Sequence, residues 1–236
     1  RMVWLLVFGM IHAWAIWYGD ILVTYALAGS LAFLFRHQPP RRLIGIGLVI
    51  LGLLIAWGFM GHFHFTQMRA LAELPNAAPE LVKQWQSESA MLAPPASEAL
   101  AEIEGYRGSI ADIFATRAKM TSFFQTFLIP TNFMWEALGF MCIGMGLFRL
   151  GFFTGAWDNR IYARLAAVLV AVGIVFGAPI AGKLWMVRWD PVTTLATDAL
   201  ATPIHLIMAI GYASAVIAIV KAGVLKLSLI HISEPT

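Results

Sequence analysis

The chain has 236 residues, of which 60% are hydrophobic and 12% are charged, and its formal net charge is +3. Soluble domains usually carry about 25% charged residues, so the composition excludes an ordinary soluble domain and a disordered chain. It also excludes a nucleic-acid-binding domain, and the single cysteine, Cys142, excludes an internal disulfide framework. We therefore expect a lipid bilayer as the surrounding medium and no nucleic-acid partner.

Six apolar runs follow one another along the chain, and most approach the length of about 20 residues that crosses a bilayer as a helix. They cover residues 2–18, 21–35, 43–60, 133–153, 161–181 and 200–220. The runs are continuous rather than alternating, which argues against a membrane β-barrel. The sequence thus predicts an all-α fold, a polytopic transmembrane helical bundle with about six spanning helices.

Between the third and fourth runs lies a long polar stretch whose apolar residues recur at near-helical spacing. We predict three short amphipathic helices at about 80–92, 97–104 and 109–119. Pro79 suits the first turn of the first of these helices, and Ser97 suits the N-cap of the second. The stretch is expected to lie on the outer membrane surface as a small helical cap.

The chain is expected to divide into consecutive segments. These are three transmembrane helices in 1–62, an extracytoplasmic amphipathic helical loop in 63–121, and three transmembrane helices in 122–227. Residues 228–236 resemble a translated sequencing adapter, so we predict that they are an artefact. The chain begins with Arg1 rather than Met, which indicates an internal fragment.

Basic residues gather beside one set of helix ends, so the positive-inside rule predicts that residues 36–42 are cytoplasmic and 63–121 extracytoplasmic. Small residues predict close helix packing, at Gly173 and Gly177 in the fifth run and at Gly139, Gly144 and Gly146 in the fourth. Pro179 is expected to kink or end the fifth helix.

Ionisable side chains within a bilayer are costly and are functional candidates by default. On the predicted topology six of them belong to the outer half of the membrane: His12, Asp20, His62, His64, Glu136 and His205. His62 and His64 are two residues apart and point to different sides of a helix. No set of these residues has the spacing of a zinc motif, so we predict no metal site.

Four of these candidates have structural explanations that the sequence leaves open. Asp20 could simply cap the second helix, and Glu136 is favoured in a first helical turn by the helix dipole. His12 could make a structural hydrogen bond rather than act in catalysis. His205 could bond to a backbone carbonyl that Pro203 leaves without a donor.

Three stretches resemble a known family. Phe8–His12, Gly19–Leu22 and Tyr25–Gly29 are similar to the Gly-x-x-His … Gly-Asp-Ile-Leu-x-x-Tyr-Ala-x-x-Gly signature of the YeiB-like bacterial inner-membrane proteins, domain-of-unknown-function family 418. Tyr106–Ser109 resembles a loop element of that family. Gly144–Phe153 resembles one of its helix ends, although Gly146 and Phe148 depart from the family pattern. The resemblance covers most of the chain to about Leu225 and implies an inner-membrane location, with further helices before and after this segment.

The resemblance implies two functions, a membrane acyltransferase-like enzyme or a transport protein. As an enzyme, His12 would act as a general base oriented by Asp20. The two lie about 80° apart around an ideal helix, so the break at Gly19 must bring them together. Arg107 could meet a phosphate or carboxylate on an acyl donor, although the base could equally lie in the missing amino-terminal helices.

As a transporter, the protein would use the outer-half histidines and carboxylates as a proton relay or substrate site. In either case Tyr25, Glu136, His205 and Arg107 are predicted to bind a small-molecule or acyl-donor substrate. The sequence identifies neither that substrate nor a cofactor.

Overall fold

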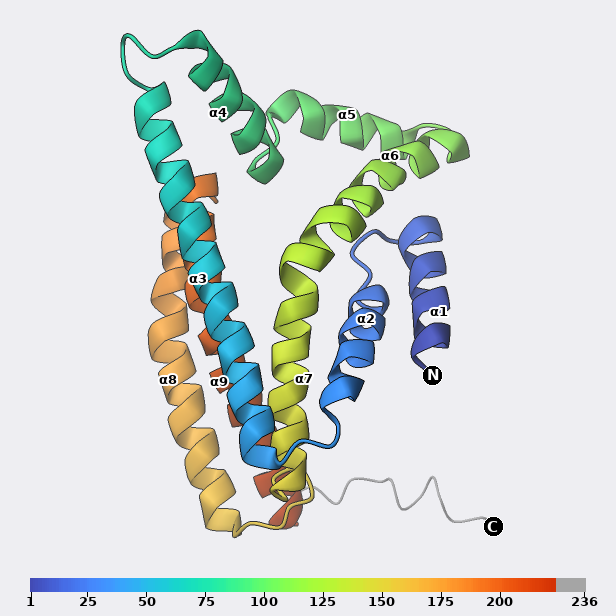
Figure 1. Cartoon of the computed structure of the whole chain (residues 1–236), viewed down its shortest axis with the longest axis vertical. Coiled ribbons are helices and arrows are strands. Elements are labelled where there is room, and N and C mark those ends of the chain that lie inside the picture. The colour runs from blue at the N-terminus through green and yellow to red at the C-terminus, as the bar shows by residue number, and fades with distance from the viewer. Residues whose placement is uncertain (224–236) are drawn as a thin grey trace.

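The computed structural model describes residues 1–223, which form helices joined by short turns without any strand (Figure 1). This confirms the predicted all-α membrane-protein class. The elements are α1 (Met2–Ala15), α2 (Leu22–Ala32), the 3-10 helix η1 (Phe33–Phe35), α3 (Pro40–Ala72), α4 (Pro79–Leu92), α5 (Ala96–Arg107), α6 (Ile110–Phe123), the π-helix η2 (Phe124–Phe133), α7 (Met134–Arg149), α8 (Asn159–Met186) and α9 (Pro191–Lys221). The proposed adapter-derived tail, 228–236, lies outside the described residues.

Four helical stretches are long and apolar enough to cross a membrane: Pro40–Ala72, Ile110–Arg149, Asn159–Met186 and Pro191–Lys221. The first two predicted spans form shorter apolar helices, Met2–Ala15 and Leu22–Phe35. At 1.5 Å per residue, the 14 residues of α1 extend about 21 Å, less than the hydrocarbon thickness of about 30 Å. Among the described residues there are therefore four full-length candidate spans, with two shorter apolar helices beside them, and the number of helices that cross the membrane stays a prediction.

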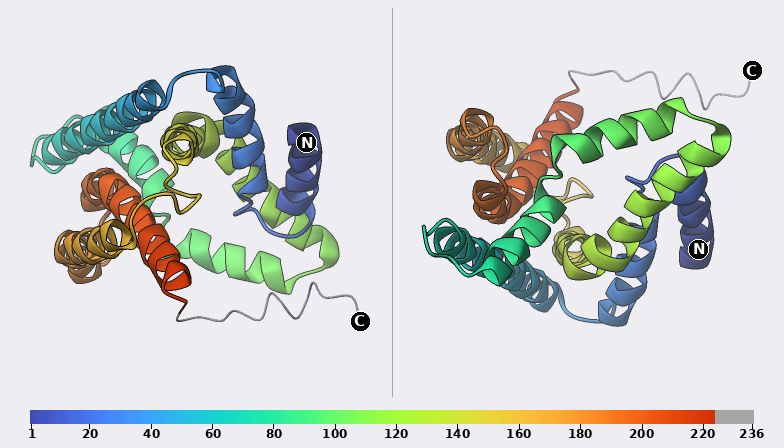
Figure 2. Two further views of the ribbon diagram at one scale, coloured as in Figure 1. Left: turned by 90° about the horizontal axis from the view of Figure 1, so that it is seen from below. Right: turned by 90° about the horizontal axis from the view of Figure 1, so that it is seen from above.

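The helices pack in the order α8, α9, α3, α7, α2 and α1, which the views along the bundle show (Figure 2). Glycines bring α3 and α7 close together, because a Cβ on Gly139 would lie 2.7 Å from Leu51 and one on Gly146 would lie 2.9 Å from the Pro40 carbonyl. Gly173 faces Met208 in the same close manner. The predicted packing role is confirmed for these three glycines. It is wrong for Gly144, whose Cβ would have nothing within 4 Å.

Beyond the bundle, α3 continues to Ala72, and α4, α5 and α6 follow as a helical cap above the bundle (Figure 1). Pro79 occupies the first turn of α4 as predicted. Ser97 is not an N-cap, because α5 begins one residue earlier, after Pro95. Ser109 instead caps α6, through a reciprocal capping box with Asp112.

The cap and the bundle are joined by continuous helix, since α6, η2 and α7 follow one another without a break. The fourth predicted span therefore starts inside a longer helical stretch rather than at residue 133. Pro130 lies within η2, where the wider π-helical turn accommodates a residue that lacks an N–H. Pro179 does not end its helix either, because α8 runs through it to Met186.

Candidate functional site

A cavity of about 510 Å³ opens between the α1–α2 turn, α2, the η2–α7 segment and α9. Its volume falls in the range of roughly 300–1,000 Å³ that is typical of small-molecule sites. The wall is mostly apolar, with a few polar side chains, and consists of Gly19, Asp20, Ile21, Thr24, Tyr25, Phe124, Phe133, Glu136, Ala137, Phe140, His205 and Ala209. The structure thus gathers four of the six predicted site residues, Asp20, Tyr25, Glu136 and His205, around one space.

His12 lies in the last turn of α1, and the turn that follows places it against Asp20. The N–H groups of Ile16 and Trp17 both donate to the His12 carbonyl, at 2.9 Å each, which ends the helix. The chain then reverses through Gly19. The His12 Nδ1 consequently lies 2.9 Å from Asp20 Oδ1, so the break in the helix brings together two residues eight positions apart.

Asp20 also caps α2, because its other oxygen accepts a hydrogen bond of 2.8 Å from the Val23 N–H. The Asp20 side chain is only 2% exposed, whereas that of His12 is 34% exposed. A buried carboxylate needs such partners. The structural and the chemical explanations of Asp20 are therefore compatible, since a different oxygen serves each of them.

The position of Gly9 explains why the Gly-x-x-His element begins with a glycine. It lies one turn before His12, where α1 contacts the start of α2. A Cβ at this position would lie 2.7 Å from the Val23 nitrogen and 3.0 Å from Asp20 Oδ2. Only glycine fits without a shift, so Gly9 permits the close approach on which the His12–Asp20 contact depends.

A second histidine–carboxylate pair has both of its members on the cavity wall, whereas His12 lies behind Asp20 and is not among the lining residues. Glu136 in the first turn of α7 and His205 on α9 are 3.7 Å apart, between Oε1 and Nδ1. His205 thus pairs with a carboxylate rather than with the backbone carbonyl that the sequence suggested. The sequence reasoning did not single out Asp198, a further carboxylate seven residues before His205 on the same helix.

The remaining predicted candidates lie away from the cavity. His62 Nδ1 is 2.8 Å from the Val192 carbonyl, and His64 Nε2 is 3.4 Å from Glu88. Arg107 is exposed at the end of α5 and does not line the cavity. Within residues 1–223, no three His, Cys, Asp or Glu side chains come together as a metal site requires.

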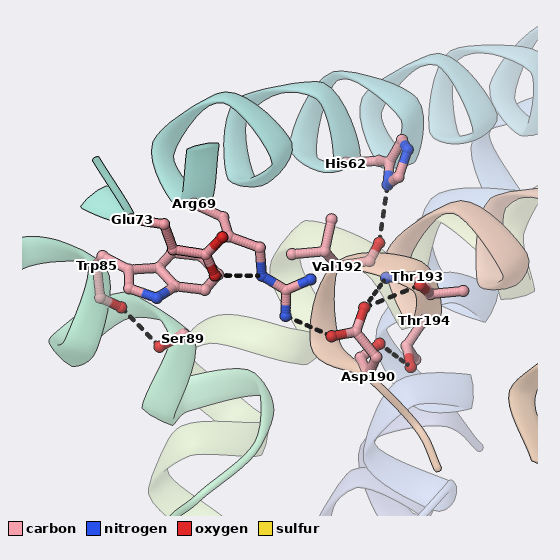
Figure 3. A network of polar contacts seen from close by, with 9 residues as sticks. All are labelled: His62, Arg69, Glu73, Trp85, Ser89, Asp190, Val192, Thr193 and Thr194. Atoms are coloured by element: carbon pink, nitrogen blue, oxygen red, sulfur yellow. Dashed lines mark hydrogen bonds and ion pairs between the residues drawn. The ribbon is translucent and has the colours of Figure 1, made fainter. Parts of the chain in front are cut away.

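A polar network that the sequence reasoning did not predict joins the upper part of α3 to the start of α9 (Figure 3). Arg69 donates to Asp190, and Asp190 accepts 2.9 Å and 2.8 Å hydrogen bonds from the Thr193 N–H and hydroxyl. Partial burial acts to raise the pKa of the Asp190 carboxyl, but these hydrogen bonds and the Arg69 charge outweigh it, so that the pKa lies below its ordinary value. The network fixes the α8–α9 turn against α3.

The long apolar helices and their packing into one bundle define a multi-pass helical membrane protein. Residues 147–231 match the family model "Protein of unknown function (DUF418)". The chain is 27% identical over 226 residues to "Uncharacterized protein YeiB" of Escherichia coli, covering 91% of this chain and 51% of that protein. These matches confirm the predicted resemblance of the chain to the YeiB-like DUF418 proteins.

A second relative, "Uncharacterized protein YxaH" of Bacillus subtilis, is 50% identical over 60 residues, which cover 25% of this chain and 15% of that protein. The chain therefore spans about half the length of YeiB and a smaller part of YxaH. No solved structure matches the chain significantly.

Proposed function

We propose that the protein is a membrane-embedded acyltransferase-like enzyme in which His12 acts as the general base and Asp20 as the residue that orients it. The observation that carries this proposal is the 2.9 Å contact between His12 Nδ1 and the buried Asp20 carboxylate beside the cavity. An imidazole held by a carboxylate at one nitrogen keeps the other nitrogen available to accept a proton.

The reaction needs one base and one acyl donor. His12 Nε2 takes the proton of an acceptor hydroxyl or amine while the acceptor atom bonds to the carbonyl carbon of an acyl thioester. The carbon–sulfur bond then breaks, and the leaving thiolate receives the proton from His12. Acceptor and donor become an acylated product and a free thiol, with no oxidant or reductant consumed.

The cavity suits a reaction from which water is excluded. Phe124, Phe133 and Phe140 form much of its wall, and Tyr25 presents a half-exposed ring with a hydroxyl. Apolar walls limit hydrolysis of a reactive thioester, and the Tyr25 hydroxyl and the Glu136 carboxylate can hydrogen-bond a polar acceptor. Arg107 is proposed to meet an anionic group of the donor, which then approaches from the cap.

The test uses the full-length protein in lipid nanodiscs and follows loss of the thioester from candidate acyl donors. His12→Ala should slow transfer by about 10²- to 10⁴-fold, the usual contribution of a general base. His64→Ala is the matched control, because His64 also contacts a carboxylate but lies away from the cavity. Absence of transfer by the wild type, or equal transfer by His12→Ala, would contradict the proposal.

A transport function is the second candidate, and the Glu136–His205 pair favours it. A histidine and a carboxylate at membrane depth are typical of proton relays. In proteoliposomes, a proton-coupled carrier should lose uptake when Glu136 is replaced by Gln, while His12→Ala retains it. Uptake that is unchanged by the Glu136 substitution would exclude a relay through this pair.

The topology and the division of the chain belong to the same proposal. We place the protein in the bacterial inner membrane with residues 36–42 in the cytoplasm and 63–121 outside, as two transmembrane segments, 1–62 and 122–227, around the cap. The positive-inside count supports this orientation. The cavity then lies nearer the outer side, where an envelope acceptor is available.

A further inference from the structure

Positive charge gathers at the end of the bundle opposite the cap, the lower end in Figure 1. The helix ends and turns in 33–44, 145–165 and 217–223 contain seven Lys or Arg residues and one acidic residue, Asp158. Hydrogen bonds hold these turns together, since Arg149 donates to the Gln38 carbonyl at 2.6 Å and Lys221 donates to that of Trp157 at 2.7 Å. This end therefore presents an ordered cationic surface.

A groove of about 500 Å³ opens in this surface between the end of α2 and α7. Its lining combines two guanidinium groups with an apolar floor and consists of Arg36, Gly144, Met145, Phe148, Arg149 and Phe153. Phe148 and Phe153 are 60% and 45% exposed. No carboxylate is among these described lining residues, so an anionic ligand meets no repulsion there.

Gly144 provides the open floor of the groove. Its neighbours in α7, Gly139 and Gly146, are glycines because α3 passes close to them, whereas a Cβ on Gly144 would have nothing within 4 Å. The missing side chain at Gly144 therefore leaves space beside Met145 and Phe148 rather than room for another helix.

Arg36 holds its charge at the rim of the groove. Its guanidinium lies 3.7 Å from the centre of the Phe33 ring and donates to the Phe33 carbonyl at 3.0 Å. A guanidinium has five N–H donors, and contacts with the described residues use one of those of Arg36. Arg149 fixes the neighbouring turn through the carbonyls of Arg36 and Gln38. The Arg36 guanidinium is thus held in place and retains N–H donors for an oxyanion.

We propose that this groove binds one anionic phospholipid, with its phosphate on Arg36 and an acyl chain along Gly144, Met145 and Phe148. Guanidinium groups suit phosphate because they offer paired donors in a planar fork. The position fits, since the basic helix ends are expected in the cytoplasmic leaflet, which is rich in anionic lipid. An apolar floor beside the charge selects a lipid over a soluble phosphate.

The test uses native mass spectrometry to measure the lipid that stays bound to the full-length protein. The protein is released in the spectrometer from detergent micelles that also contain phosphatidylglycerol and phosphatidylethanolamine. Arg36→Gln should weaken phosphatidylglycerol retention about fivefold, which corresponds to the loss of one cation at a membrane surface. Gly144→Leu should weaken it as much by filling the floor, without loss of thermal stability. Arg160→Gln is the matched control, because Arg160 belongs to the same cationic end but not to the groove.

Three results would overturn the proposal. Equal loss from Arg160→Gln and Arg36→Gln would mean that only diffuse charge attracts the lipid. Unchanged retention by Gly144→Leu would mean that no chain occupies the floor. Displacement of the lipid by millimolar glycerol phosphate would identify a soluble phosphate site instead. None of these measurements depends on acyl transfer, so they are independent of the proposed enzyme activity.

Discussion

Two substitutions of Asp20 separate its structural contact from its chemical one. Asp20→Ala removes both the 2.8 Å acceptor for the Val23 N–H and the 2.9 Å partner of His12. Asp20→Asn retains a carbonyl oxygen of the same size, which can still accept from Val23. Its amide group, however, donates to His12 Nδ1, which places the proton on Nε2 and removes the proposed base. We therefore expect alanine to impair both stability and activity and asparagine to impair activity alone.

The magnitudes follow from the geometry. Loss of a capping acceptor costs about 0.5–2 kcal/mol, and the freed Val23 N–H is buried, so the upper half of that range applies. The imidazole left behind is 34% exposed and partly hydrated, which limits its further cost to about 1 kcal/mol. Asp20→Ala should thus destabilise the protein by about 2 kcal/mol and Asp20→Asn by less than about 1 kcal/mol.

The assay compares reversible unfolding in mixed detergent micelles with thioester loss in nanodiscs, for the wild type and both variants. Both variants should lose at least about 100-fold in transfer rate. If asparagine destabilises the protein as much as alanine, then the charge of Asp20 rather than its capping oxygen stabilises the turn. If asparagine transfers acyl groups at the wild-type rate, then His12 is not the base.

Three further measurements test other parts of the structure. Gly9→Val should cost about 1–3 kcal/mol of unfolding free energy by separating α1 from α2, whereas Gly52→Ala, with open space at its Cβ, should be neutral or slightly stabilising in the same melt. Because the pKa of Asp190 is lowered, its stabilisation is present above its ordinary value of 3.8 and is lost as the pH falls below it; Asp190→Asn should remove this dependence in acid unfolding curves. An impermeant maleimide should label Ser97→Cys in intact cells and Asn159→Cys only after lysis, and the reverse pattern would invert the proposed topology.

The His12–Asp20 contact could be predicted because it is local. Eight residues separate the pair, and the Gly19 break between them leaves few geometries for the turn. Ionisable residues are costly among apolar residues, so the sequence alone identified both Asp20 and His12 as candidate site residues. The same reasoning marked Glu136 and His205 singly but not as a pair, since 69 positions separate them and their contact depends on how α7 and α9 are placed by α3.

The lengths of the helices were less predictable. The sequence predicted a short amphipathic helix at 109–119 and a separate span that starts at residue 133, yet one helical stretch continues from Ile110 to Arg149. A helix retains its backbone hydrogen bonds whether its side chains meet lipid, protein or water, so composition marks the membrane boundary and not the helix end. Of the two effects predicted for Pro179, a kink or a helix end, the helix end is wrong, since the loss of one N–H does not end a long apolar helix.

This continuous stretch couples the cap to both histidine–carboxylate pairs. In its upper part Thr121 donates to the Ala13 carbonyl at 3.1 Å, and Arg117 donates to that of Ala15. These bonds hold the last turn of α1, which carries His12. The same stretch then lines the cavity through η2 and places Glu136 in the first turn of α7. A displacement of α6 therefore moves His12 and Glu136 together, so that the position of the cap bears on both pairs at once.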